Sequence, residues 1–455
     1  MKIQKIIFCS IQISIDYILK AKKKNLPFIP KSRKMMNSFK PLLDSFMPAI
    51  GSNVEQVASQ EIRLNIPKIP VDQVVKLCKQ VRDIFQKELS MLELRSPCLI
   101  VGDIHGHILD LFRILFKCGM PPFRKYIFLG DLVDRGEFST ETVILIFLMK
   151  VVYPEHVYII RGNHEFNCLS QQCGFFSEVI DIYEEPSVYN ACINAFSYMP
   201  LAARIDNKIL CVHGGIGPGF DSLNCIKTIL RPLCEYGHSD VINAILWSDP
   251  SEEVEEYAPS SRGTGFLFGK KAIDEFIKNC NIELVVRGHE CVNDGIEMHF
   301  DGHLMTVFSA SNYCGLINNQ AAVLDIKGEG KYDIKKFPPL EYLHRSDVTF
   351  GQKISPPRDG ASSSRRLTKG AGIASSHKIV PPITSLPIVS DRIKPCTHRV
   401  EETSSYRLMP KLTGEKLPIL TPRPYQENNA PRLFQENNAP ALIRPPSHRR
   451  CKSWY

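Results

Sequence analysis

The stretch Cys98-Leu99-Ile100-Val101-Gly102-Asp103-Ile104-His105-Gly106 joins four consecutive apolar residues to a short polar turn. An apolar run of this length is typical of a buried strand, and the two glycines favour a tight turn after it. Alternate residues that leave a strand can turn toward one ion, so Asp103 and His105 offer one oxygen and one nitrogen ligand. A single Asp-x-His is common, so this motif gains weight only from the rest of the chain.

A short apolar run followed by a polar motif recurs five more times. The later motifs are Gly130-Asp-Leu-Val-Asp-Arg-Gly136, Arg161-Gly-Asn-His-Glu165, His213-Gly-Gly215, Arg287-Gly-His-Glu290 and Ser309-Ala-Ser-Asn-Tyr313. Helix-like segments, including 110–117 and 140–152, lie between the runs. Strands that alternate with helices predict a layered α/β fold. Because ligands gather at the carboxyl ends of strands in such sheets, we expect all six motifs to meet at one rim.

The first five motifs carry side chains that hold divalent cations. Asp131 has two carboxylate oxygens and can bridge two ions. The natural partition gives one ion Asp103, His105 and Asp131. The other ion then takes Asp131, Asn163, His213 and His289. Mixed nitrogen and oxygen ligation without thiolate suits Mn, Fe or Zn better than Ca, so we expect two such divalent ions, with Mn the practical choice in vitro.

Two adjacent cations lower the pKa of a bridging water and clamp phosphoryl oxygens, which predicts hydrolysis of a phosphate ester. The guanidinium groups of Arg135 and Arg262 match phosphate oxygens. His164 is free to protonate the departing alkoxide as general acid, and Asp134 would orient its ring. The plainer alternatives are a structural Asp134–Arg135 salt bridge and a satisfied loop histidine at 164.

Taken together, the six motifs resemble the PPP family of Ser/Thr phosphatases, which comprises the type-1, type-2A and calcineurin group. The likeness covers roughly residues 60–340. It implies a metallophosphoesterase fold with a central β-sandwich flanked by helices, a two-metal site, and direct hydrolysis of phosphoserine and phosphothreonine by an activated hydroxide. It also adds Tyr313 as a phenol on the substrate side, and it gives Arg135, Asn163, Arg262 and Tyr313 roles in substrate binding.

The sequence departs from the family pattern without losing a ligand. Leu132, His107 and Ser311 stand where Tyr, Gln and Pro are usual, and Gly288 and Glu290 replace the Ala and Gln of type-1 enzymes. The overall likeness is to divergent type-1 enzymes. Docking of the usual regulatory peptides near Met298 and 335–337 is in question, because aromatic residues are fewer there.

Charge is unevenly spread along the 455 residues, whose net charge is +8. Residues 1–55 hold ten basic and three acidic side chains, and 351–455 hold 18 and seven, which leaves 28 and 38 for the middle. We therefore expect a basic, poorly ordered extension over 1–55 and a catalytic domain over 56–345. The segment 346–455, which is rich in Pro and Ser and duplicates nine residues at 425–442, is expected to be disordered.

Fifteen cysteines without a paired framework indicate free thiols in a reducing compartment, and no long apolar segment predicts a membrane span. We expect a cytoplasmic or nuclear enzyme whose partners are phosphoprotein substrates and regulatory subunits. The basic tail could contact an acidic partner or nucleic acid. Two alternatives stay open: an inactive scaffold, and another metallophosphoesterase such as a dinucleoside-polyphosphate hydrolase. The latter is disfavoured by the acidic middle of the chain and by the intact segments at 262–269 and 309–315.

Overall fold

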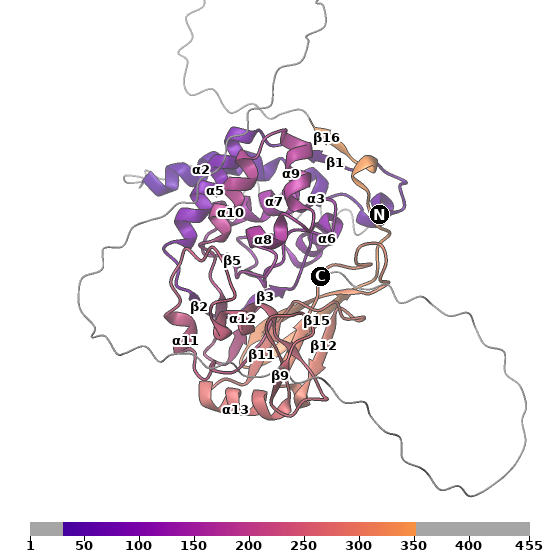
Figure 1. Ribbon diagram of the computed structural model, residues 1–455. Coiled ribbons are helices and arrows are strands. Elements are labelled where there is room, and N and C mark those ends of the chain that lie inside the picture. The colour runs from indigo at the N-terminus through magenta and orange to yellow at the C-terminus, as the bar shows by residue number, and fades with distance from the viewer. Residues whose placement is uncertain (1–30, 352–455) are drawn as a thin grey trace, which may run out of the picture. The chain divides into compact units, whose positions relative to one another are not determined.

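The computed structural model describes residues 31–351, with side chains from residue 38 onward, and the elements of this part are shown in Figure 1. Expectations for 1–30 and 352–455, the duplicated segment included, lie outside the described residues. No helix in the described part is long and apolar enough to cross a bilayer.

Two β-sheets form the centre. One has six strands in the order β12-β13-β11-β7-β6-β2, and the other has five in the order β15-β14-β3-β4-β5. The strands of the first are β2 (Met91–Leu94), β6 (Ala202–Ile205), β7 (Ile209–Cys211), β11 (Leu284–Arg287), β12 (Ile296–His299) and β13 (Leu304–Val307). Those of the second are β3 (Cys98–Val101), β4 (Tyr126–Phe128), β5 (Val157–Ile159), β14 (Ala321–Gly328) and β15 (Lys331–Phe337). Strands β3, β4 and β5 run parallel, as do β7, β11 and β13.

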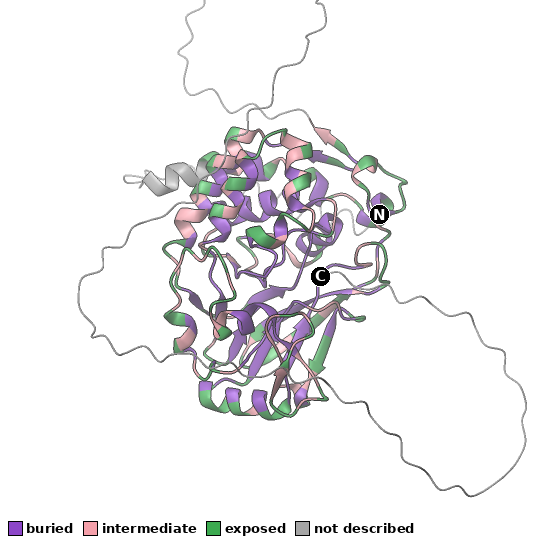
Figure 2. Ribbon diagram, viewed as in Figure 1, coloured by how far each residue is buried: buried purple, intermediate pink, exposed green. Residues whose placement is uncertain are grey.

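Alternating side chains of each buried strand serve two different cores. In β3, Cys98 and Ile100 join the cluster between the two sheets, whereas Leu99 and Val101 pack under helices. Successive side chains of a strand point to opposite faces, so a continuous apolar run fits a strand covered on both sides. The expected β-sandwich flanked by helices is confirmed, and Figure 2 shows its strands largely buried.

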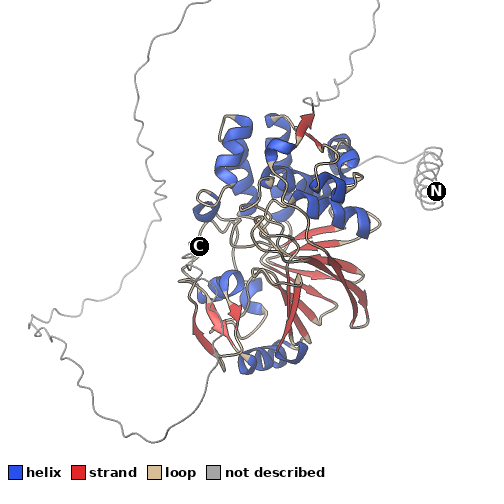
Figure 3. Cartoon of the chain, turned by 90° about the vertical axis from the view of Figure 1, so that its right-hand side faces the viewer, coloured by secondary structure: helices blue, strands red, loops and turns tan. Residues whose placement is uncertain are grey.

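Helices cover the outer face of each sheet, as Figure 3 shows. Against the five-stranded sheet lie α2 (Lys31–Asp44), α3 (Met47–Ile50), α4 (Val54–Ala58), α5 (Val71–Phe85), α6 (Ile108–Cys118), α7 (Ser139–Val152), α9 (Phe175–Tyr183) and α10 (Ser187–Phe196). Against the other lie α12 (Asp240–Trp247) and α13 (Lys270–Cys280), and α8 (Asn167–Ser170) and α11 (Asn224–Lys227) are single turns. Short strands β8 (Asp249–Pro250), β9 (Tyr257–Pro259) and β10 (Phe266–Phe268) form a small separate sheet.

The expected domain boundaries differ from the structure at both ends. Helix α2 buries Phe39, Leu42 and Leu43 in the main core, so the segment before residue 56 contributes to the folded unit. This segment also has apolar residues at helical spacing, but its basic charge led to the expectation of a poorly ordered extension. At the other end, strand β16 (Thr349–Gly351) pairs with β1 (Asn65–Pro67), so the folded unit extends past 345. Between β1 and β2 the chain forms the long helix α5.

Candidate metal centre

The expected ligands lie at the carboxyl ends of strands from both sheets. Asp103, Asp131 and Asn163 follow β3, β4 and β5 of one sheet, and His213 and His289 follow β7 and β11 of the other. A backbone bridge between Asp103 and Phe308 joins the two rims. The six expected ligands, with His105 included, are all 9% exposed or less. The site is therefore a buried junction of the two sheets, as the strand–motif pattern predicts.

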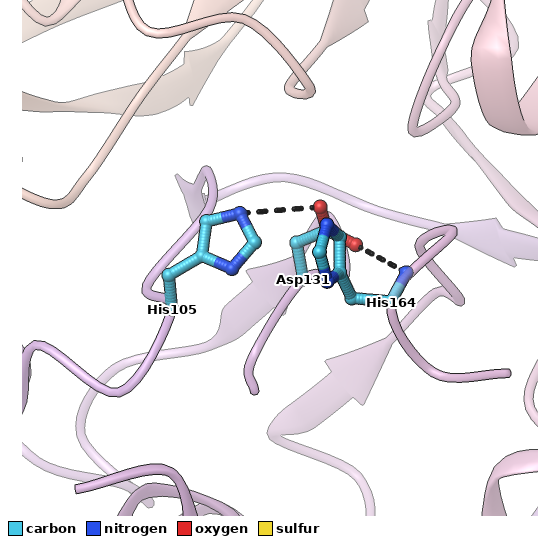
Figure 4. Close-up of side chains that lie close together, drawn as sticks. All are labelled: His105, Asp131 and His164. Atoms are coloured by element: carbon cyan, nitrogen blue, oxygen red, sulfur yellow. Dashed lines mark hydrogen bonds and ion pairs between the residues drawn. The ribbon is translucent and has the colours of Figure 1, made fainter. Parts of the chain in front are cut away.

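Asp131 lies at the middle of the cluster. One of its carboxylate oxygens is 3.3 Å from His105 Nε2 and 3.4 Å from His213 Nε2. The other oxygen accepts a hydrogen bond from the His164 backbone amide at 3.0 Å, and Figure 4 shows the carboxylate between His105 and this amide. One Asp131 oxygen thus lies within reach of an imidazole from each of the two expected ligand groups, which fits a binuclear metal site.

Bonds around the cluster aim the imidazoles inward. His105 Nδ1 donates to the Val133 carbonyl at 2.7 Å, and His213 Nδ1 donates to the Leu129 carbonyl at 3.0 Å. Each bond fixes the tautomer and leaves Nε2 with its lone pair toward Asp131, an arrangement that is usual for metal-bound histidines. Asp131, His105 and His289 also have positive φ, a conformation that non-glycine residues retain at functional sites.

The donor set around Asn163 fits a cation. Its side-chain oxygen lies 2.8 Å from His213 Nε2, and the same position is 3.2 Å from His289 Nδ1 and 3.1 Å from Asp131. Electron-pair donors that converge in this way repel each other unless a cation lies among them or the amide turns over to present its NH₂. The other ring nitrogen of His289, Nε2, is buried and has no hydrogen-bond partner among the described residues. The described residues therefore fit the second metal position.

The pKa shifts of the clustered side chains also fit bound cations. Burial raises the pKa of the Asp103 carboxyl. For Asp131, burial acts in that direction too, but the charges of His213 and His164 outweigh it and hold the pKa well below its usual range. Burial disfavours the charged His105 ring, yet its bond to Asp131 raises its pKa to about 9. The carboxylates thus demand compensating positive charge, which divalent cations would supply in place of protons.

Glu165 holds the Asp131 turn and was given no role in the sequence analysis. Its buried carboxylate accepts hydrogen bonds from the backbone amides of Asp131, Leu132 and Gly162 at 2.7–2.9 Å. A Cβ atom at Gly162 would lie 2.2 Å from the Asp131 Oδ1 atom, which explains the glycine between Arg161 and Asn163. Glu165 is the last residue of the 161–165 motif, so its position could have marked it as functional. Sequence alone, however, does not show that its carboxylate caps a turn.

The expected acid pair is formed. His164 Nδ1 lies 2.7 Å from an Asp134 oxygen, and the other Asp134 oxygen accepts from the Phe175 amide at 2.9 Å. Asp134 is completely buried, so this bond is strong, fixes Nδ1 toward Asp134 and leaves Nε2 as the nitrogen that can exchange a proton. Asp134 therefore contacts His164 and not the Arg135 side chain. The thiol of Cys173, which no sequence motif indicates, also lies close to this pair.

The residues expected to bind substrate surround the cluster. Arg135 is exposed, and its guanidinium has no hydrogen bond or ion pair within residues 31–351. The Tyr313 ring centre lies 5.5 Å from that of His105. Arg262 is held by a 2.5 Å bond from Nε to Asp249, whose other oxygen lies 4.0 Å from His289 Nε2. Asp249 thus links Arg262 to the cluster.

Known proteins resemble this chain in sequence and in fold. Residues 96–293 match the family model described as calcineurin-like phosphoesterase. The serine/threonine-protein phosphatase 4 catalytic subunit of Saccharomyces cerevisiae is 42% identical over 258 residues, which are 57% of this chain and 83% of that protein. The PP2A-like phosphatase PPG1 of Candida albicans is 37% identical over 62% of this chain and 68% of its own length. A solved S. cerevisiae protein serine/threonine phosphatase with similarity to human PP5 superposes with a TM-score of 0.57 at 30% identity, covering 60% of this chain and 92% of that one.

Fold and site together define a metallophosphoesterase, with carboxylates and imidazoles at the seam of a β-sandwich. At these levels of identity and coverage, the chain belongs to the PPP family of serine/threonine protein phosphatases. These relatives are named for type 4 and for a type-2A-like enzyme, so the expected type-1 likeness stays a prediction.

Proposed function

We propose that this protein removes phosphate from phosphoserine and phosphothreonine in proteins. The observation that carries the proposal is the 2.7 Å contact between His164 and buried Asp134, directly beside the carboxylate of Asp131. The relatives at 37–42% identity are named as serine/threonine protein phosphatases, which supports the same substrate class.

We propose that Asp103, His105 and Asp131 hold one divalent ion and that Asp131, Asn163, His213 and His289 hold a second. When bound, such a pair supplies Lewis acidity and lowers the pKa of water. Mn, Fe or Zn would suit these donors, with Mn the most practical in vitro.

The remaining roles follow from the side chains themselves. Arg135, free and exposed, and Arg262, steadied by Asp249, would bind the phosphate oxygens through their planar donors. His164 would give its Nε2 proton to the serine or threonine oxygen as the phosphorus–oxygen bond breaks. Asp134 would hold Nδ1 and stabilise the charged ring. Tyr313, packed beside His105, would close one side of the site.

For partners and location we propose phosphoprotein substrates, regulatory subunits of the kind that a catalytic subunit has, and a cytoplasmic or nuclear place of action. An acidic protein or nucleic acid is proposed as the contact of the basic tail, on charge alone.

The test compares purified protein and its His164→Ala variant, both loaded with Mn²⁺, on phosphoserine, phosphothreonine and phosphotyrosine peptides. We expect turnover of the first two by the unaltered protein, and a loss of about 10²- to 10⁴-fold in the variant with its bound metal retained. Turnover restricted to phosphotyrosine or to dinucleoside polyphosphates would overturn the substrate class, and no turnover by the metal-loaded protein would favour the scaffold. Unchanged turnover by His164→Ala would remove its acid role.

A further inference from the structure

A thiol lies beside the acid pair. The Cys173 Sγ atom, a carboxylate oxygen of Asp134 and a ring nitrogen of His164 all lie within 4.8 Å of one another. Asp134 is completely buried, His164 is 6% exposed, and Cys173 is partly buried. None of the six proposed ligands of the metal pair is a cysteine, so this group of donors differs in kind from that site.

Backbone bonds hold Cys173 at this place. Its carbonyl accepts from the Arg135 amide at 3.3 Å, and the Phe175 amide donates to Asp134 at 2.9 Å. Gly174, between them, has φ of 131°, which a glycine adopts without strain. The turn 173–175 is thus fastened to the 134–135 turn on both sides. The thiol is positioned by the same contacts that position Asp134.

We propose that Cys173, His164 and Asp134 form a binding site for a thiophilic divalent cation, Zn²⁺ in the first place, and that its occupation inhibits the enzyme. Sulfur, nitrogen and carboxylate oxygen are the three donors that Zn²⁺ uses in proteins, and three protein ligands leave a fourth position for water. Bonds of 2.0–2.2 Å in a tetrahedron place neighbouring nitrogen and oxygen ligands about 3.3 Å apart. The His164–Asp134 pair, now 2.7 Å apart, has to open by roughly half an ångström.

Binding replaces protons with the cation. The Cys173 thiol releases its proton to solvent and binds as thiolate. The proton between His164 Nδ1 and Asp134 is also released, and both atoms then bind Zn²⁺. No atom changes oxidation state, so no oxidant or reductant is needed. The His164 ring keeps a single proton at Nε2 and no longer forms the imidazolium that Asp134 stabilises, which makes it a much weaker acid toward a leaving alkoxide. This inhibition rests on the proposed function of His164, whereas the binding does not.

Binding is tested with Co²⁺, which takes the place of Zn²⁺ and shows a thiolate-to-cobalt charge-transfer absorption only when sulfur is bound. Co²⁺ is added to full-length protein already loaded with Mn²⁺. We expect the absorption in the unaltered protein and in Cys168→Ser, a control at an exposed thiol nearby in sequence. We expect its loss in Cys173→Ser, with folding checked by thermal denaturation. No absorption in the unaltered protein, or undiminished absorption in Cys173→Ser, overturns the proposal.

Inhibition is tested separately, by Zn²⁺ titration of phosphopeptide turnover in excess Mn²⁺. Cys173→Ser should need at least tenfold more Zn²⁺ for half-inhibition than the unaltered protein and Cys168→Ser. Equal sensitivity of all three would show that Zn²⁺ acts elsewhere, for example within the metal pair, and would refute the inhibitory role. A protein that turns over no phosphopeptide but shows the cobalt absorption would retain the site and lose the proposed function.

Discussion

Replacing Asp134 by asparagine tests the acid pair with little change of shape. The amide oxygen can still accept from the Phe175 amide, but the NH₂ group then faces His164 Nδ1 and forces the tautomer that carries no proton there. The variant therefore loses the stabilisation of a charged His164 ring while it keeps the ring in place.

The size of the effect follows from the bond that is lost. A buried hydrogen bond between charged groups contributes about 1.5–3 kcal/mol, which corresponds to a fall in kcat of about 10- to 150-fold. This loss should appear only where the leaving group needs a proton. A phosphoserine peptide releases a strongly basic alkoxide, whereas p-nitrophenyl phosphate releases a stable anion that departs without protonation.

The assay is therefore kcat for both substrates, measured on Mn²⁺-loaded protein with and without the substitution. We expect the full loss on the peptide and little change on p-nitrophenyl phosphate. Asp274→Asn is the matched control, because that carboxylate is 40% exposed, pairs with Lys270 at 2.7 Å and contributes little to stability. An equal fall on both substrates would falsify the claim that Asp134 acts through the His164 proton.

Three further outcomes follow from packing and charge. Removal of 352–455 should leave the melting temperature and phosphopeptide turnover unchanged. Removal of 346–455 also deletes β16 and buried Val348, and should lower the melting temperature by at least about 4 °C in calorimetry. Glu178 is buried beside Glu141, and burial raises its pKa to about 7 from 4.5. Between pH 4.5 and 7 the folded protein therefore holds a proton on Glu178 that the unfolded protein has lost, and the free energy of unfolding falls as pH rises through this range. The melting temperature should fall over the same range, and Glu178→Gln should make that fall smaller. His107 Nε2 accepts from the Cys314 amide at 3.1 Å, so His107→Ala should loosen the loop of Tyr313 and raise KM about tenfold with a smaller change in kcat; an unaltered KM would count against this positioning.

The predicted strands and ligands were recognisable because each motif combines two independent signals. An apolar run of three to five residues marks a buried strand, and the residue that follows it marks the rim. All six expected ligands lie within one buried cluster for this reason, although Asp103 and His289 are 186 residues apart in sequence.

What sequence could not supply depends on tertiary contacts. Helix α2 carries Lys40 among its buried apolar residues, so net charge masked its packing. The cap that Glu165 forms requires three amides from two loops. Cys173 follows no recognisable metal motif, and only the fold brings its thiol to Asp134. The link that Asp249 makes between Arg262 and Arg287 is visible only in three dimensions.

The seam between the sheets also bears on the order in which the protein can mature. If the proposed partition holds, the ligands of one ion are complete when residue 131 has been synthesised, whereas those of the other await residue 289. At about 5–20 residues per second, the ribosome needs roughly 8–30 s for the 158 residues between them. A nascent chain would pass through a stage in which the ligands of only one ion are present, and the second ion could be bound only after residue 289 has been made.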